Sequence, residues 1–366
     1  MQQSIYKSVI TLSMLFMACS ASANDFIIKD LTNSAIENSS FPFFSSEIYP
    51  QSASNINTFL QYEMLDKVYE ESDFSKVSTS PFKNTEYHRR NFYFYDYKIK
   101  ENTNYIEVSI SGDGCGAYCE EFTRNFVFDT YTGQPITIID FLSPQGRIQL
   151  EQKIRDKNIE RIEPYIKKEP DVSFEEEHDM YIMYKYCHDD MLDEDSYANR
   201  INQNTSFELL DSGLVIKHGR CSNHALRALD EIGTFVNNFS FDELKPYLSQ
   251  AGEKYLSNQP YQLPEIKTEF KIRYGKIDNK YPITVIHTDR SGWVYWYDKY
   301  KAPIDLYEGS RTGTGNNTLV LKESYYDEGK GKTVYTARWN ITENKGVYSG
   351  TFTRLSDLKE MVVSFQ

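Results

Sequence analysis

Residues 105–139 read YIEVSISGDGCGAYCEEFTRNFVFDTYTGQPITII, and this stretch sets the architecture of the longest predicted unit. Apolar and polar residues alternate on both sides of the GDGCGAYC segment, which predicts two strands, Tyr105–Ser111 and Phe122–Asp129. Ile106, Val108 and Ile110 would share one face of the first strand. The sequence therefore predicts an antiparallel pair that turns around Cys115 and Cys119.

The same pattern extends outward from this pair. A further strand begins at Phe92, and Thr130–Gly133 reads as a tight turn. Ser143-Pro144 begins a helix, because serine caps helix N-termini and proline fits the first helical position. A capping box, Ser240–Glu243, begins another helix that would run to about Leu256. We interpret residues 88–257 as an α+β domain, an antiparallel sheet packed with helices.

The flanking regions differ from this domain. Residues 24–50 show no clear period, and residues 56–71 have the apolar spacing of a helix, so 24–87 read as an N-terminal arm and helix. After a linker at 258–264, residues 265–366 show short strands at regular spacing. This last pattern predicts a small all-β domain, a barrel or a sandwich.

The N-terminus carries an export signal. Residues 1–23 hold one charge, Lys7, then an apolar run and an Ala-Ser-Ala cleavage pattern ending at Ala23. The run is too short to cross a bilayer, which takes about 20 residues. We expect cleavage after Ala23 and a periplasmic or secreted protein without stable membrane insertion. Lipidation at Cys19 is the disfavoured alternative, because Phe16 and Met17 suit a lipoprotein signal poorly.

The remaining cysteines are Cys115, Cys119, Cys187 and Cys221. An even number in an exported chain indicates disulfides, and three pairings are open. We favour Cys115–Cys119 with Cys187–Cys221, because the first pair is local. A zinc site is the alternative, because His178, His188, His218 and His224 lie near Cys187 or Cys221, but the close ligand pairs of such sites are missing.

A five-residue disulfide ring would display its side chains rigidly and lower the entropic cost of binding. We therefore take this turn as the candidate binding loop, with the alternative that it is a purely structural hairpin. The loop comprises Gly114, Cys115, Gly116, Ala117, Tyr118, Cys119, Glu120 and Glu121.

No catalytic residue and no metal or cofactor site is predicted. Residues 163–200 are rich in carboxylates, but a solvated acidic face explains them better than paired catalytic acids or calcium. Met183, Tyr184 and Tyr186 read as core or edge residues. Trp293 and Trp296 alternate with tyrosines on one strand and could stack on sugars, although barrel packing is the favoured interpretation.

Charge narrows the class of partner. The 366 residues include 40 Lys+Arg and 53 Asp+Glu, a net charge of −13 that becomes −14 when Lys7 is removed with the signal. An acidic chain repels phosphate backbones, so we expect no nucleic acid and favour a basic protein partner.

The order of motifs resembles a known family. GDGCGAYCEE is followed by NFVFDTYTGQPITIIDFL at 125–142, FELLDSGLVI at 207–216 and FSFDELKPYL at 239–248. Residues 88–257 thereby resemble an exported domain family of unknown function, found in lysozyme-sensing anti-sigma factors and beside the catalytic domain of some peptidoglycan deacetylases. The resemblance implies binding to lysozyme, although the GCGAYC loop replaces a glycine- and histidine-containing loop of the family.

These observations favour a non-catalytic exported protein-binding module, an inhibitor of or immunity protein against a lysozyme-like cell-wall hydrolase. The alternatives are a peptidoglycan- or carbohydrate-binding protein that uses Trp293 and Trp296, and a cell-wall-modifying enzyme that uses the acidic cluster.

Overall fold

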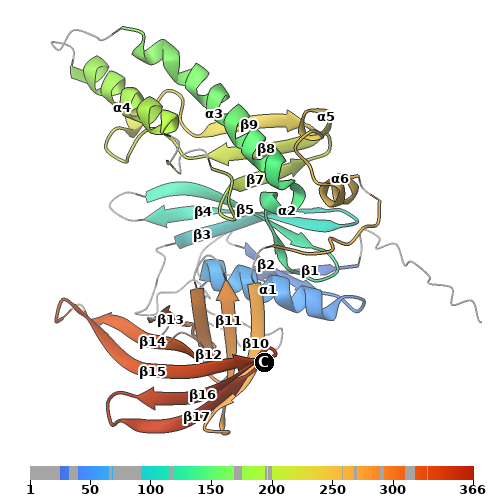
Figure 1. The fold of residues 1–366 in the computed structure, drawn as a ribbon, viewed down its shortest axis with the longest axis vertical. Coiled ribbons are helices and arrows are strands. Elements are labelled where there is room, and N and C mark those ends of the chain that lie inside the picture. The colour runs from blue at the N-terminus through green and yellow to red at the C-terminus, as the bar shows by residue number, and fades with distance from the viewer. Residues whose placement is uncertain are drawn as a thin grey trace, which may run out of the picture.

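A computed structural model gives the fold of the chain (Figure 1). It describes residues 25–32, 40–65, 68, 92–115, 119–168, 175–193, 196, 200–257, 259–267, 270–288, 292–309, 318–327 and 329–366. The expected signal peptide lies outside these residues. The α+β class is confirmed, because helices pack on antiparallel sheets and a closed barrel of strands follows them.

The N-terminal arm is more regular than its sequence suggests. Strands β1 (Ile27–Thr32) and β2 (Ser40–Ser45) form an antiparallel hairpin, and helix α1 (Pro50–Leu65) follows. The expected helix at 56–71 is therefore displaced toward the N-terminus. Its first turns were missed because they bury polar side chains: Ser52 donates to the Thr130 carbonyl at 2.8 Å, and Asn55 donates to the Thr132 carbonyl at 2.8 Å.

The central sheet contains the strands expected on both sides of the GDGCGAYC segment. Its order is β3-β4-β5-β6, and all neighbours are antiparallel. Ile106, Val108 and Ile110 are buried on the face toward α1, as their spacing predicts. Gly133 closes the turn after β5 with a φ of +65°, and a Cβ there would lie 2.2 Å from the Ser52 carbonyl oxygen. The strands are β3 (Phe92–Glu101), β4 (Tyr105–Cys115), β5 (Cys119–Asp129) and β6 (Pro135–Ile136).

A second sheet and most of the helices cover the other side of this sheet (Figure 1). The sheet order is β7-β8-β9, again antiparallel. Helix α3 is capped at Ser143, whose hydroxyl accepts from the Gly146 N–H, as predicted. The elements are α2 (Ile138–Phe141), α3 (Pro144–Ile166), α4 (Glu175–Leu192), β7 (Ser206–Leu210), β8 (Gly213–His218), β9 (Phe235–Ser240), α5 (Phe241–Leu244) and α6 (Gln250–Leu256).

The helix expected from Ser240 to Leu256 is divided in two. The Ser240 capping box begins α5 as predicted, but α5 ends at Leu244. Proline has no backbone N–H to donate to a helical hydrogen bond, and Pro246 lies two residues after Leu244. Ser249 then caps the separate helix α6.

The C-terminal strands form a closed antiparallel barrel rather than a sandwich. The pairing of β10 with β17 closes it. Its interior includes Trp293, Tyr295 and Trp339, all nearly inaccessible to solvent. The strands are β10 (Phe270–Ile277), β11 (Tyr281–Thr288), β12 (Gly292–Tyr297), β13 (Ile304–Glu308), β14 (Thr318–Asp327), β15 (Lys332–Asn344), β16 (Val347–Arg354) and β17 (Lys359–Phe365).

Helix α1 joins the barrel to the central sheet (Figure 1). The ring of Phe59 on α1 meets Phe126 and Phe128 of the sheet at centroid distances of 5.7 and 5.4 Å. The same ring meets Phe270 of β10 at 5.0 Å. One aromatic cluster therefore spans the N-terminal helix, the α+β domain and the barrel.

Candidate functional site

The predicted binding loop lies at the end of the β4–β5 hairpin. Cys115 and Cys119 are opposed in the strand register, so the backbone turns where the sequence places the loop. Residues 116–118 lie outside the described part, and the Cys115–Cys119 disulfide stays a prediction. Glu121, opposite Asp113 in the register, is exposed.

The second predicted disulfide is confirmed. Cys187 on α4 is bonded to Cys221 in the segment that follows β8. The bond lies beside a small core in which Met183 and Tyr184 pack against Ile162 of α3. It therefore ties α4 to the α+β domain. Among the described residues, no group of three or more His, Cys, Asp or Glu side chains is arranged to hold a metal ion.

A half-buried carboxylate holds the inner face of α4. Asp230 accepts hydrogen bonds from the Tyr184 hydroxyl at 3.0 Å, the Ser222 hydroxyl at 2.6 Å and the Gly233 N–H at 2.9 Å. Burial opposes ionisation of Asp230, but these hydrogen bonds outweigh it and lower the pKa of the carboxyl. Tyr184 is fixed in turn, because its hydroxyl also accepts from the Ile232 N–H.

The outward face of α4 is acidic with an apolar centre. Asp179, Ile182, Tyr186 and Asp189 follow one another at spacings of three and four, which places them on one side of a helix. Tyr186 is 73% exposed and Ile182 is 36% exposed. We call these four residues the α4 face. Its apolar pair is flanked by carboxylates on both sides.

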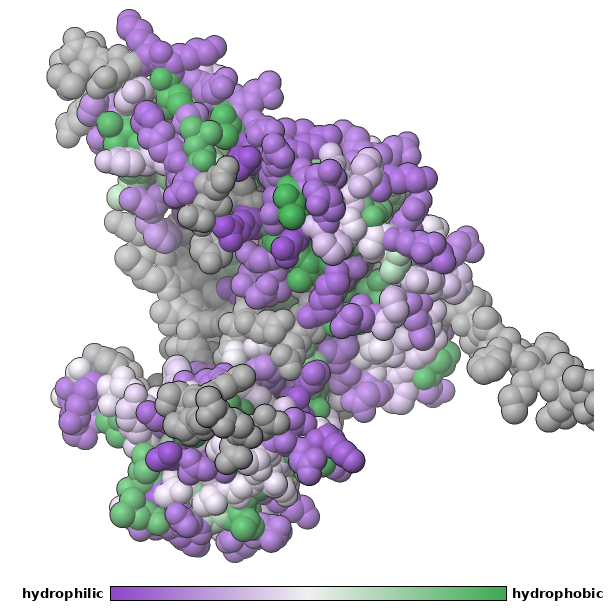
Figure 2. Space-filling model, in the orientation of Figure 1, coloured by the Kyte–Doolittle hydropathy of each residue, from purple (hydrophilic) through white to green (hydrophobic). Residues whose placement is uncertain are grey.

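The charge of α4 is strongly negative. Its sequence, EEEHDMYIMYKYCHDDML, contains Lys185 as its one lysine among acidic residues. Lys185 binds Asp189, with Nζ 2.7 Å from Oδ2, and this contact lowers the pKa of the carboxyl. Figure 2 shows the arm formed by α3 and α4 as mostly hydrophilic, with a few hydrophobic side chains among the charged ones.

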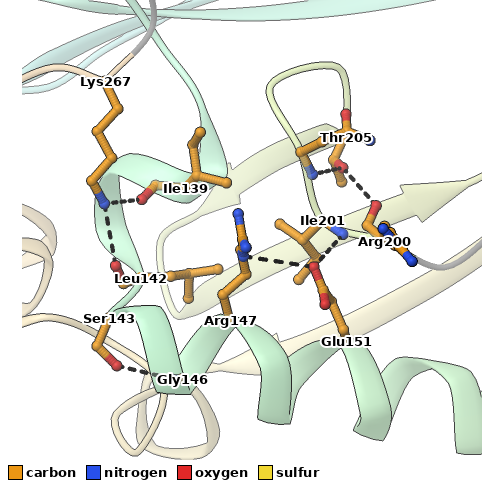
Figure 3. Close-up of polar contacts among 11 residues, drawn as sticks. Ile139, Leu142, Ser143, Gly146, Arg147, Glu151, Arg200, Ile201, Thr205 and Lys267 are labelled. Carbon is orange, nitrogen blue, oxygen red and sulfur yellow. Dashed lines mark hydrogen bonds and ion pairs between the residues drawn. The ribbon is translucent and has the colours of Figure 1, made fainter. Parts of the chain in front are cut away.

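Local contacts fix the base of this arm (Figure 3). Glu151 of α3 accepts from the Ile201 N–H at 2.8 Å and lies 3.8 Å from Arg147. Lys267, in the linker to the barrel, donates to the Ile139 carbonyl at 2.6 Å. The start of α3 is thus tied both to the segment before β7 and, through α2, to the linker.

The interpretation of Tyr186 as a core or edge residue like Met183 and Tyr184 needs correction, because Tyr186 is 73% exposed and lies on the opposite side of α4 from Tyr184. A helical-wheel comparison of α4 would have found this, since residues two apart point in nearly opposite directions. Trp293 and Trp296 are 5% and 3% exposed, so both are core residues and offer no free ring face for sugar stacking. The favoured packing of Trp293 and Trp296 agrees with their burial, and the sugar-stacking alternative is wrong.

Comparisons with known proteins give little further information. No protein-family model matches the chain, and no curated protein matches it. A crystal structure described as a member of the DUF3298 family, from Bacteroides fragilis, aligns with 64% of this chain and 96% of its own, with 11% identity and a TM-score of 0.35. This TM-score is too low to bear on mechanism. No helix among the described residues is both long and apolar enough to span a membrane.

Proposed function

We propose that the protein is an exported, non-catalytic binding module that captures a basic, lysozyme-like cell-wall hydrolase. The observation that carries the proposal is the exposed Tyr186–Ile182 pair between carboxylates on a helix whose other face is locked in place. Tyrosine is enriched among residues that dominate binding energy. The α4 face is the docking surface in this proposal.

Rigidity favours this surface. The Cys187–Cys221 bond and the Asp230 hydrogen bonds fix α4 before any partner arrives. A surface that is already ordered loses less conformational entropy on association, so more of the contact energy appears as affinity.

Charge supports a basic partner. Carboxylates surround the apolar pair, and the chain without residues 1–23 has a net charge of −14. Complementary charge speeds encounter and weakens as salt screens it. The resemblance of residues 88–257 to the lysozyme-sensing family supports the choice of a lysozyme, and inhibition or immunity is the resulting biological role.

The test uses residues 24–366 with a panel of basic lysozymes. We expect binding at low salt, weaker binding at high salt, and slower lysis of cell walls. Tyr186→Ala should weaken binding by about 30-fold, the effect of a residue that contributes about 2 kcal/mol. Its stability should change by less than about 0.5 kcal/mol, because the side chain is exposed.

Tyr307→Ala is the matched control, because Tyr307 is 55% exposed on β13 of the barrel. It should bind as the unchanged protein does. If the protein bound none of the lysozymes at low salt, the assignment of a lysozyme-like partner would be overturned. Unchanged binding by Tyr186→Ala would overturn the docking surface.

A further inference from the structure

A cleft of about 760 Å³ lies where the barrel meets α1. One wall is β10, with Lys271, Arg273 and Tyr274, and another is the start of α1, with Gln51. Glu343 and Tyr348 of the β15–β16 hairpin line a third side. The cleft is far along the chain from α4 and plays no part in the docking surface.

Arg273 is the unusual member of this lining. It is 8% exposed, and its Nη1 is buried without a hydrogen-bond partner. Its guanidinium carbon lies 5.4 Å from the ring centre of Trp293 and 4.9 Å from that of Tyr348. No ion pair joins it to a carboxylate of the described residues. Aromatic faces attract a cation but leave its N–H donors unsatisfied.

The other charged residues that line the cleft do not supply the carboxylate that Arg273 lacks. Glu343 is committed locally, since its Oε1 accepts from the Gly346 N–H at 2.6 Å. Lys271 adds a second positive charge to the lining. Exposed Arg354 shows the usual arrangement, with Nε and Nη2 donating to the two oxygens of Asp357 at 2.9 and 2.5 Å. Arg273, which solvent hardly reaches, has no such carboxylate among the described residues.

An unpaired buried charge is costly, and such charges are normally compensated by an opposite charge. A guanidinium presents a planar fork of donors that matches a carboxylate or a phosphate. Gln51, whose Nε2 donates to Asn55 Oδ1 at 3.0 Å, and the Tyr274 and Tyr348 hydroxyls add neutral polar groups to the walls of the cleft. These groups suit the hydroxyls of a sugar.

We propose that this cleft binds an acidic sugar, whose carboxylate or phosphate pairs with Arg273. The anion satisfies the buried guanidinium, and the neutral polar walls take the hydroxyls.

The protein is titrated with four probes, and binding is measured by calorimetry and by tryptophan fluorescence. D-glucuronate carries a carboxylate, glucose 6-phosphate carries a phosphate, glucose is neutral, and inorganic phosphate lacks the sugar. We expect one of the two acidic sugars to bind at least about tenfold more tightly than glucose, since a charged hydrogen-bonded pair is lost with glucose. The fluorescence should change, because Trp293 contacts the guanidinium. The acidic sugar that binds more tightly shows whether the site prefers a carboxylate or a phosphate. Weaker binding of inorganic phosphate shows that the sugar ring contributes to affinity.

Arg273→Met tests the pairing. Methionine keeps most of the packing volume but cannot pair with an anion, so affinity should fall by about 10- to 100-fold. Its thermal midpoint should be unchanged or higher, because a buried unpaired charge is removed. A purely structural role would instead lower the midpoint. Arg338→Met, at an exposed position of β15, is the matched control and should bind as the unchanged protein does.

Gln51→Ala, at an exposed position of α1, keeps the test decisive if Arg273→Met does not fold. It should weaken binding of the acidic sugar by about fivefold, because one neutral hydrogen bond is lost. Failure of both acidic sugars to bind the unchanged protein would overturn the proposal. The proposal would also be overturned if Arg273→Met bound the acidic sugar as tightly as the unchanged protein. If Arg273→Met is unfolded, the same result for Gln51→Ala would overturn it.

Discussion

The barrel and the α3–α4 arm stabilise themselves in different ways. The barrel closes on itself, and each strand pairs with two neighbours around a large aromatic and aliphatic core. The arm has a small core around Met183 and Tyr184, and it adds the Cys187–Cys221 bond and the Asp230 hydrogen bonds. A thin layer buries too little apolar surface to be stable without such cross-links.

The same contrast governs the aromatic residues. In the barrel, Trp293, Tyr295 and Trp339 fill the interior. On α4, Tyr184 is buried and Tyr186 is exposed, only two residues apart. An aromatic-rich composition therefore serves packing in one region and leaves a candidate contact residue in the other.

The largest expected effect lies in the barrel core. Trp339 is fully buried, with ring centroids 4.8 Å from Tyr295 and 5.3 Å from Phe352. Trp339→Ala should lower the free energy of unfolding by about 3–5 kcal/mol, through lost contacts and a residual cavity. Denaturant unfolding measures this, and Trp339→Phe should lose less. Hydrogen exchange of Trp339→Ala would contradict the comparison if the α4 amides lost protection while the barrel amides kept theirs, because the two regions would then not stabilise themselves separately.

The disulfide should produce a smaller and more local effect. Cys187 and Cys221 are 34 residues apart in sequence. Replacing both with alanine should cost about 2–4 kcal/mol of stability, because the unfolded arm regains chain entropy. Hydrogen exchange should show faster opening of α4 and unchanged protection in β14 and β15. Equal loss of protection in the barrel would contradict the comparison.

The smallest expected effect depends on pH. Burial between the two sheets raises the pKa of Glu107 to about 7, despite the hydrogen bond from the Leu209 N–H and nearby Lys100 and Lys217. Between the ordinary glutamate pKa of 4.5 and this value, the folded chain binds more protons than the unfolded chain, so stability falls as pH rises. Glu107→Gln should thus gain about 1–3 kcal/mol at pH 8 and little at pH 4.

Urea unfolding at both pH values checks this prediction. Glu360→Gln is the control, because Glu360 is exposed on β17 of the barrel. It should change stability equally little at both pH values. A Glu107→Gln effect that does not grow with pH would show that the carboxyl is not held in its protonated form.

Much of the local structure follows from short-range patterns. The turns at Asp278-Asn279 and Lys345-Gly346 both have positive φ at consecutive residues, the geometry of tight hairpins, and asparagine and glycine favour that geometry. Ser143 and Ser240 cap helices where the sequence places them. The sequence pattern does not reveal the start of α1, because its polar side chains Ser52 and Asn55 are satisfied by distant backbone groups. It does not reveal the N-terminal hairpin either.

The candidate sites were harder to predict than the fold. Cys187–Cys221 could be favoured by elimination among few cysteines, whereas Tyr186 required knowledge of which side of α4 faces the core. Arg273 gave no signal at all, because an arginine within a strand is ordinarily exposed.

Short-range patterns predict most of the strands, the caps, the tight turns and the division into helical and all-β parts, since each depends on residues close along the chain. The tertiary structure alone decided that β10 pairs with β17 to close the barrel and that α1 lies between barrel and sheet. It also decided that Arg273 is buried while Tyr186 is exposed. These outcomes depend on which distant surfaces exclude water from one another, and local periodicity carries no record of that choice.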